Sequence, residues 1–190
     1  MEDAYPASLL ALSLQGMDIK EKGIAWVVMG VSGCGKSAVG ARLAAALDAP
    51  FVEGDDYHSP ENVARMSAGI ALTDADRQGW LEALRAEIAH AGSKGIVLSC
   101  SSLKRAYRDI LRGAGDAPGQ VRFAHLAGER GLIEARMRGR PGHYMPASLL
   151  DSQLRTLEPL QSDEAGITLD AGEDPDTLVG RILASAGSGR

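Results

Sequence analysis

The sequence predicts an α/β fold in which a mostly parallel sheet carries helices on both faces. Short apolar runs alternate with longer helical patterns along the 190 residues, as in chains whose strands are joined by helical crossovers. A glycine-rich segment directly follows the first run, at the kind of position where doubly wound folds bind their ligands. The composition agrees, because 45% hydrophobic and 24% charged residues are ordinary for a globular domain.

Five short apolar runs are predicted to be strands. Residues 24–29 form a continuous apolar run, which is typical of a strand that is buried on both faces of a sheet. The other predicted strands are residues 50–53, 95–100, 121–126 and 166–170. Together they predict a five-stranded sheet.

Helices are predicted between these strands, and several begin at recognisable capping residues. Ser59 suits an N-cap position, and Pro60 suits the first helical position after it. Thr73 and Asp76 have the spacing of a capping box, which predicts that a second helix starts at this point. The remaining helices are predicted at residues 36–47, about 103–112, about 129–138 and from about 175 onward.

We expect the chain to form a single domain. Residues 1–20 contain a short apolar run, but two acidic residues precede it, so we interpret them as an N-terminal extension rather than a signal peptide. Met17 is a candidate translation start, because the regular pattern begins only near Ile24. The predicted domain therefore spans residues 21–190.

Charge and cysteine content limit the classes of function. The formal net charge is −5, unlike the basic character of a general nucleic-acid-binding protein. No stretch of the sequence reaches the length of a membrane span. Cys34 and Cys100 have no disulfide or metal-ligand spacing. These features predict a cytoplasmic protein without a nucleic-acid or membrane partner, and they leave open whether it forms a homodimer.

Residues 30–37, GVSGCGKS, fit the phosphate-loop pattern G-x-x-x-x-G-K-[ST] in full. In such a loop the backbone N–H groups turn toward phosphate oxygens, the lysine reaches the β- and γ-phosphates, and the final hydroxyl ligates Mg²⁺. A strand before the loop and a helix after it complete the expected context. The pattern predicts a nucleoside triphosphate site with Mg²⁺ on Ser37. The candidate nucleotide-binding residues are Gly30, Ser32, Gly33, Cys34, Gly35, Lys36, Ser37 and Ala38.

The positions of acidic residues favour a small-molecule kinase among phosphate-loop proteins. The N-K-x-D element with which GTPases read guanine is absent, and the strand at 95–100 ends in serines rather than in an acidic residue. Asp55 and Asp56 instead follow the second strand, beside the phosphate loop if the two strands are neighbours. A carboxylate there can orient and deprotonate an acceptor hydroxyl.

Basic residues follow the second and third strands as well. His58, Arg65 and Arg77 come after the acidic pair, and Lys104, Arg105 and Arg108 come after the third strand. Cations at the carboxyl ends of strands suggest an anionic acceptor. The alternative is that these arginines are solvated helix charges in surface ion pairs.

A second basic segment covers about residues 129–150. Arg130, Arg136, Arg138 and Arg140 lie close together, and Gly139, Pro141 and Gly142 interrupt the helical pattern. This combination favours a lid that closes over ATP and neutralises charge during transfer. A solvated basic helix is the alternative.

Four stretches together resemble the gluconate kinase family: MGVSGCGKSAVG, GDDYHSPENVARMSAGIALTDADRQGWL, SCSSLKRAYRDILR and RPGHYMPASLLDSQLRTLEPL. The resemblance covers residues from about Trp26 to about Leu160. It implies a three-layer α/β/α P-loop kinase that transfers phosphate from ATP to the C6 hydroxyl of D-gluconate. The phosphate loop is shared by many families, whereas the second and third stretches are more specific.

The resemblance also implies roles for individual residues. Lys36 and Ser37 would serve phosphate and Mg²⁺, and Asp55 would be the base, with Asp56 as its competitor. The expected acceptor-site residues are His58, Arg77 and Lys104, and Arg136 and Arg140 fall on lid positions. Arg65 is a further acceptor-site candidate because of its place after the acidic pair.

Two alternative functions and one reactive group stay open at the sequence level. A related kinase could act on another small hydroxy acid such as shikimate, or the chain could be a regulatory module that binds ATP and transfers nothing. Cys34 stands at a helix N-terminus beside Lys36, where a thiolate is favoured. Its oxidation or alkylation would then block ATP binding, unless Cys34 is only a small residue tolerated in the turn.

Overall fold

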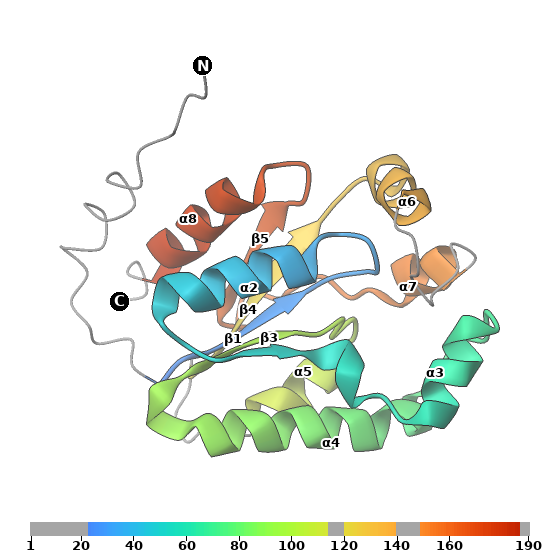
Figure 1. Ribbon diagram of the computed structural model, residues 1–190, viewed down its shortest axis with the longest axis horizontal. Helices are drawn as coiled ribbons and strands as arrows, with labels where there is room; N and C mark the ends of the chain where they lie inside the picture. Colours follow the sequence, from blue (N-terminus) through green and yellow to red (C-terminus); the bar gives the residue numbers. More distant parts are fainter. Residues whose placement is uncertain (1–22, 114–119, 140–148, 187–190) are drawn as a thin grey trace.

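In the computed structural model, five parallel strands form one sheet between two layers of helices (Figure 1). The structure describes residues 23–113, 120–139 and 149–186. The strand order is β2-β3-β1-β4-β5, and every neighbouring pair is parallel. The predicted sheet is confirmed, with strands β1 (Ala25–Met29), β2 (Phe51–Glu53), β3 (Ile96–Ser99), β4 (Val121–Ala127) and β5 (Gly166–Asp170).

Helices connect the strands and cover both faces of the sheet. The predicted helices are present as α2 (Lys36–Leu47), α3 (Pro60–Ser67), α4 (Asp74–Ala91), α5 (Arg105–Arg112), α6 (Arg130–Arg138) and α8 (Pro175–Ala186). Three further elements were not predicted: the short helices η1 (Gly54–Tyr57) and η2 (Gly92–Lys94), and α7 (Leu150–Thr156). The predicted N-terminal extension, residues 1–20, lies outside the described residues.

The central strand divides the core between the two helical layers. Along β1, Trp26 and Val28 face the side that α2 and α8 cover, whereas Val27 and Met29 face the side of α4 and α5 (Figure 1). All four side chains are at most 1% exposed. This is the continuous apolar run from which a doubly buried strand was predicted. A third, smaller cluster joins Met66, Leu72 and Leu149 away from the sheet.

The two helix starts that the sequence predicts from capping residues, those of α3 and α4, carry the expected caps. The backbone N–H of Asn62 donates to the Ser59 hydroxyl at 3.2 Å. At the start of α4, the N–H of Thr73 donates to the Asp76 carboxylate at 2.8 Å, and the N–H of Asp76 donates to the Thr73 hydroxyl at 3.2 Å. These bonds satisfy amides that a helix leaves unpaired at its first turn, so they fix where α3 and α4 begin.

The segment after α7 is tied to the β3–α5 connection by a buried arginine. The Arg108 and Glu164 side chains have no exposed surface, and two charge-assisted hydrogen bonds of 2.7 and 2.8 Å join them. Arg108 also donates to the carbonyl oxygens of Ser102 at 3.2 Å and Glu158 at 3.1 Å. On the surface nearby, Arg105 pairs with Asp163 through bonds of 2.7 and 2.8 Å.

These contacts show that two of the predicted site cations hold the fold together instead. Arg105 and Arg108 do not line the cleft described below, because acidic side chains and carbonyl groups of the 158–164 segment bind them. Within the described ranges, no helix combines the length and the apolar character that crossing a membrane requires.

Candidate active site

The phosphate loop joins the end of β1 to the start of α2. Gly33 and Gly35 adopt φ angles of 83° and 104°, a region that favours glycine. A Cβ atom on Gly33 would also lie 2.6 Å from the Cγ atom of Met137 in α6. Gly35 is the N-cap of α2 and has no side chain to cap the helix, so the first amides of α2 stay available to an anion.

Two cations flank this loop. The Lys36 ammonium donates to the carbonyl oxygen of Val31 at 3.0 Å, so the side chain folds back over the loop. Arg136 of α6 reaches the same loop, and its guanidinium donates to the carbonyl oxygen of Cys34 at 3.4 Å. Buried contacts of Ile133 with the core hold α6 in this place. The predicted residue Arg140 and the following Pro141 and Gly142 lie outside the described residues, whereas Gly139 is the C-cap of α6.

Of the two interpretations of Cys34, the structure favours the packing residue over the reactive thiol. Its side chain is 1% exposed and belongs to the core cluster under the phosphate loop. Burial raises the pKa of the Cys34 thiol, and the charge of Lys36 and hydrogen bonds from loop amides lower it by less. A thiol that is buried and protonated is a poor nucleophile, so Cys34 is a packing residue of the turn.

One cleft brings the phosphate loop together with Asp55, the first residue of the acidic pair. Lys36 and Asp55 both line it, whereas Asp56 does not and is exposed. The strand neighbours differ from the expectation, because β3 lies between β1 and β2. The lining residues are Ser32, Lys36, Asp55, His58, Met66, Leu72, Arg77, Ser101, Leu103 and Gln153.

Asp55 is positioned by contacts of the glycine that precedes it. The Trp80 indole N–H donates to the carbonyl oxygen of Gly54 at 2.7 Å, and the N–H of Gly54 donates to the Ser99 hydroxyl at 3.4 Å. A Cβ atom on Gly54 would overlap the carbonyl oxygen of Ser99. The turn η1 is therefore pressed against the end of β3, and this contact sets the direction in which Asp55 leaves the sheet.

His58 lies at the same cleft in a neutral state. Its ring stacks on Trp80 with centroids 4.3 Å apart and an interplanar angle of 16°. Burial lowers the pKa of His58, and the charge of Arg77 lowers it further, while Asp55 raises it by less than burial lowers it. Trp80 itself is 3% exposed, so it supports His58 from the core.

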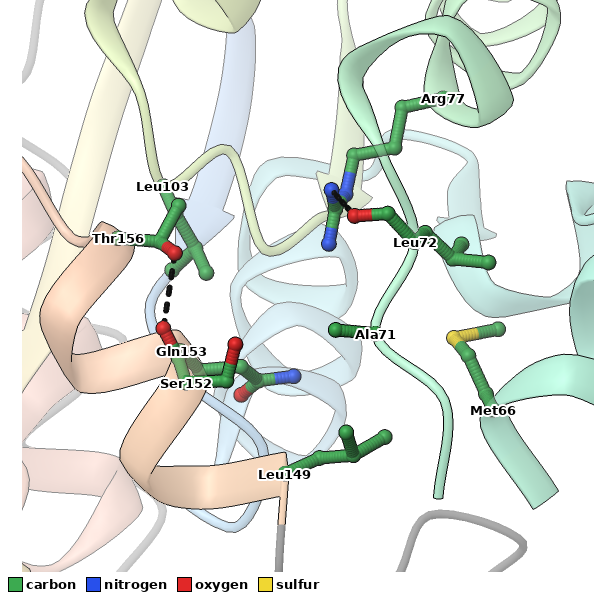
Figure 2. Close-up of a pocket in the computed structure, with 9 residues that line it drawn as sticks. All are labelled: Met66, Ala71, Leu72, Arg77, Leu103, Leu149, Ser152, Gln153 and Thr156. Atoms are coloured by element: carbon green, nitrogen blue, oxygen red, sulfur yellow. Dashed lines mark hydrogen bonds between the residues drawn. The ribbon is translucent and has the colours of Figure 1, made fainter. Parts of the chain in front are cut away.

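Arg77 is the cation that projects from α4 into the cleft. Its Nη1 atom donates to the carbonyl oxygens of Leu72 at 2.5 Å and Thr73 at 3.4 Å. The guanidinium carbon also lies 5.7 Å from the centroid of the Tyr107 ring. These contacts hold the guanidinium at the mouth of the cleft, where Figure 2 shows it beside the Leu72 carbonyl.

The structure does not bring the other two predicted acceptor residues to the cleft lining. The Lys104 ammonium contacts both carboxylate oxygens of Asp74 at 2.8 Å. Hydrogen bonds from Lys104 and Tyr107 lower the pKa of Asp74. Arg65 lies 3.5 Å from the carboxylate of Asp76. Both cations therefore bind the first turn of α4, the helix that carries Arg77.

Among the lining residues that sequence reasoning missed, Gln153 contacts the phosphate loop directly. Gln153 comes from α7, and its Oε1 atom accepts a 2.7 Å hydrogen bond from the backbone N–H of Ser32 in the phosphate loop. Figure 2 shows it in an adjoining hollow between α7 and the α3–α4 segment. The four-residue spacing of Leu150 and Leu154 was the available sign of a helix here; nothing in the sequence marked Gln153 as a site residue.

The residues present suit a nucleoside triphosphate. The loop offers helix N-terminal amides and two cations, Lys36 and Arg136, which are the groups that bind polyphosphates. In the described part of the chain, no three His, Cys, Asp or Glu side chains gather into a metal site. A hydroxyl such as that of Ser37 suits Mg²⁺, which usually keeps several water and phosphate ligands.

Comparisons with known proteins agree with this arrangement. The family model described as Shikimate kinase matches residues 32–185. A solved shikimate kinase from Bacteroides thetaiotaomicron is only 18% identical, with a TM-score of 0.60 over 86% of this chain and 98% of that one, and so shares the fold alone.

Gluconokinases are much more similar. The gluconokinase of Gluconobacter oxydans is 45% identical over 161 residues, which cover 83% of this chain and 88% of that protein. A crystal structure of a gluconokinase from Sinorhizobium meliloti is 44% identical, with a TM-score of 0.78 over 87% of this chain and 93% of that one. With this identity over most of both chains and a shared fold, the chain belongs to the gluconokinase family of P-loop kinases.

Proposed function

We propose that the protein is a gluconokinase, which transfers the γ-phosphoryl group of ATP to the C6 hydroxyl of D-gluconate. The products are 6-phosphogluconate, ADP and one proton. The observation that carries the proposal is the single cleft lined by both Lys36 and Asp55, in a chain 45% identical to a gluconokinase. A phosphate-binding cation and a carboxylate in one cleft are what transfer to a hydroxyl requires.

On the donor side, the phosphate loop holds the triphosphate and its cations balance negative charge. Lys36 would leave the Val31 carbonyl and turn to the phosphates, while Arg136 neutralises charge on the transferring group. The Ser37 hydroxyl would hold Mg²⁺, which supplies further charge neutralisation when it is bound. Arg140 is proposed as a second cation on the donor side, because the resemblance to gluconate kinases gives it a lid position.

On the acceptor side, Asp55 orients the C6 hydroxyl and accepts its proton as the new P–O bond forms. Arg77 binds the gluconate carboxylate. Among the described residues, it is the cation that lines both the cleft and the adjoining hollow. The neutral ring of His58 forms a hydrogen bond with a hydroxyl group of gluconate, as donor or as acceptor. Lys104 and Arg65 hold the first turn of α4 through Asp74 and Asp76, and so position Arg77.

A kinase acting on shikimate is the second candidate, because the matching family model carries that description. Identity favours gluconate, at 45% with a gluconokinase against 18% with a shikimate kinase. Both candidates use the same donor site and differ only in the acceptor. An acceptor comparison therefore separates them.

The test measures ADP release from Mg·ATP alone and with D-gluconate, shikimate or D-glucose. We expect strong stimulation by gluconate and none by the other two. Lys36→Ala should lose most of this turnover while its circular dichroism spectrum and unfolding midpoint stay close to wild type. Stimulation by shikimate instead would replace the substrate and keep the donor site. ATP binding without stimulation by any acceptor would support a regulatory nucleotide-binding module.

A further inference from the structure

Gln153 forms a contact between two parts of the site that are 121 residues apart in the chain. It comes from α7, on the acceptor side, and its Oε1 atom accepts a hydrogen bond from the backbone N–H of Ser32 at 2.7 Å. Ser32 is 5% exposed and lies inside the phosphate loop. The bond therefore joins the acceptor side of the cleft directly to the loop that binds ATP.

This bond fixes the orientation of the Gln153 amide. A glutamine side chain carries one acceptor oxygen and an NH₂ group with two donors. Because the oxygen is engaged by Ser32, the nitrogen must point elsewhere, and Figure 2 shows it directed into the hollow on the side of Ala71. The phosphate loop thus sets where the donor end of Gln153 lies.

The surroundings of this donor group are those of an acceptor site. The main cleft and the hollow adjoin each other, because both are lined by Met66, Leu72, Arg77, Leu103 and Gln153. Three of these five are apolar, and Arg77 and Gln153 are the two that offer hydrogen-bond donors to both spaces. Arg77 supplies positive charge, and Gln153 supplies uncharged donors.

We propose that Gln153 is a positioning residue for the acceptor, with its Nε2 atom donating to a gluconate hydroxyl near the reacting end. The inference rests on the proposed function and adds a residue to it. Since the same amide is anchored on Ser32, the acceptor is placed relative to the phosphate loop rather than to the cleft wall alone. Such placement increases the fraction of bound acceptor that has the geometry required for phosphoryl transfer.

Two substitutions separate the two ends of the amide. Gln153→Met keeps the length of the side chain and removes both hydrogen bonds, whereas Gln153→Glu keeps an acceptor for Ser32 and removes the donors. Gln78→Met is the matched control, because Gln78 is exposed on α4 and bonds Glu82. For each variant we would measure kcat and KM with gluconate, and the Kd of a non-hydrolysable ATP analogue by calorimetry.

For Gln153→Met we expect the gluconate KM to rise roughly 10-fold or more, the scale of an unpaired polar contact. The Kd of the ATP analogue should rise much less than the gluconate KM, because Lys36, Arg136 and the amides at the start of α2 still bind the triphosphate. Gln153→Glu should also raise the gluconate KM, although it still accepts from Ser32. Gln78→Met should behave as wild type in every assay.

Three outcomes would overturn the proposal. An unchanged gluconate KM in Gln153→Met would remove Gln153 from acceptor binding. Wild-type behaviour of Gln153→Glu would reduce its role to holding the loop. An equal loss of ATP-analogue binding in Gln153→Met would assign it to the donor site. Wild-type enzyme without gluconate turnover would instead refute the proposed function, and with it the basis of the inference.

Discussion

Asp55 and Asp56 are chemically identical neighbours, and their surroundings distinguish them. Asp55 lines the cleft with Lys36, whereas the Asp56 side chain points to solvent from the same short turn η1. A general base must lie within hydrogen-bond reach of the proton it accepts. At the residue scale, the choice between the two carboxylates therefore depends on direction and not on residue type.

We predict that Asp55→Asn lowers kcat roughly 100-fold or more, in line with the usual contribution of a positioned base. The gluconate KM should change little, because the amide keeps the size and most hydrogen bonds of the carboxylate. Steady-state kinetics with varied gluconate measure both. Asp56→Asn is the matched control and should keep kcat within about 2-fold of wild type; a larger loss in Asp56→Asn than in Asp55→Asn would exchange the two roles.

The donor-site residues could be predicted from the sequence, and part of the acceptor site could not. Lys36 and Ser37 belong to a local pattern with a fixed strand–loop–helix context, so the spacing alone predicts their positions. Lys104 follows a strand just as a site residue would, but it pairs with Asp74, 30 residues earlier. Gln153 reaches Ser32 only through tertiary packing, and no local signal encodes such a contact.

At the scale of elements, the turn η1 requires a glycine at residue 54 for reasons of space and not of backbone conformation. A Cβ atom on Gly54 would overlap the carbonyl oxygen of Ser99, because β2 and η1 approach β3 more closely than a side chain permits. The hydrogen bond from the Trp80 indole to Gly54 holds the turn from the other side. The closeness of β3 therefore controls the position of Asp55.

We predict that Gly54→Ala destabilises the protein by about 2 kcal/mol or more, the usual cost of forcing atoms into a packed site. It should also lower kcat, because η1 must shift and carry Asp55 with it. Urea unfolding and steady-state kinetics measure the two effects. Gly79→Ala is the control: a Cβ atom there meets nothing within 4 Å in the middle of α4, so it should stabilise by about 0.4–1 kcal/mol.

Elements with a strong local signal were predicted well, and α7 was missed. The capping bonds at Ser59 and Thr73 fixed the starts of α3 and α4 in agreement with the sequence. By contrast, α7 has seven residues and no side-chain cap at Leu149. Short uncapped helices are marginal on their own. Its stability comes from burial of Leu150 and from the contacts of its neighbours, which only the folded structure reveals.

At the scale of the whole molecule, the buried Arg108–Glu164 pair connects two residues that are 56 positions apart in the chain. It joins α5 to the connection between α7 and β5, and Arg108 also donates to four carbonyl groups at 3.4 Å or less. Both side chains have no exposed surface. Removing one partner of such a pair leaves a buried charge uncompensated.

We predict that Glu164→Gln lowers the free energy of unfolding by about 3–5 kcal/mol at neutral pH. Asp163→Asn breaks the neighbouring ion pair with Arg105, which is solvent-exposed, so it should stay close to wild type. Urea unfolding of the three proteins side by side measures the difference. Equal stability of Glu164→Gln and Asp163→Asn would contradict a structural role for the buried pair.

The pH dependence of stability should fall into two windows. Burial lowers the pKa of His58 and His125 below the ordinary 6.5, so unfolding takes up protons and stability declines as pH falls below about 6.5. Hydrogen bonds from Arg105 lower the pKa of Asp163, and those from Lys104 and Tyr107 lower that of Asp74. Their stabilisation is complete above the ordinary 3.8 and is lost below it.

His125 provides the test of the upper window. Burial is the largest cause of its lowered pKa, followed by the charge of Arg108. Among the described residues its Nε2 atom has no hydrogen-bond partner, so His125→Leu removes a titrating group at small cost in contacts. We expect a smaller decrease in unfolding free energy between pH 7.5 and pH 5.5 in this variant than in wild type. An identical slope would mean that His125 does not titrate on unfolding.

The strand order has a consequence for how this architecture diversifies. The phosphate loop follows β1 and Asp55 follows β2, and β3 lies between these two strands. The segment that carries the acceptor-side carboxylate can therefore change in sequence while the phosphate loop keeps its own. The same fold accordingly matches a family model described as Shikimate kinase in a chain that is 45% identical to a gluconokinase. To change which acceptor the enzyme phosphorylates, the segments to redesign are therefore those that follow β2 and β3.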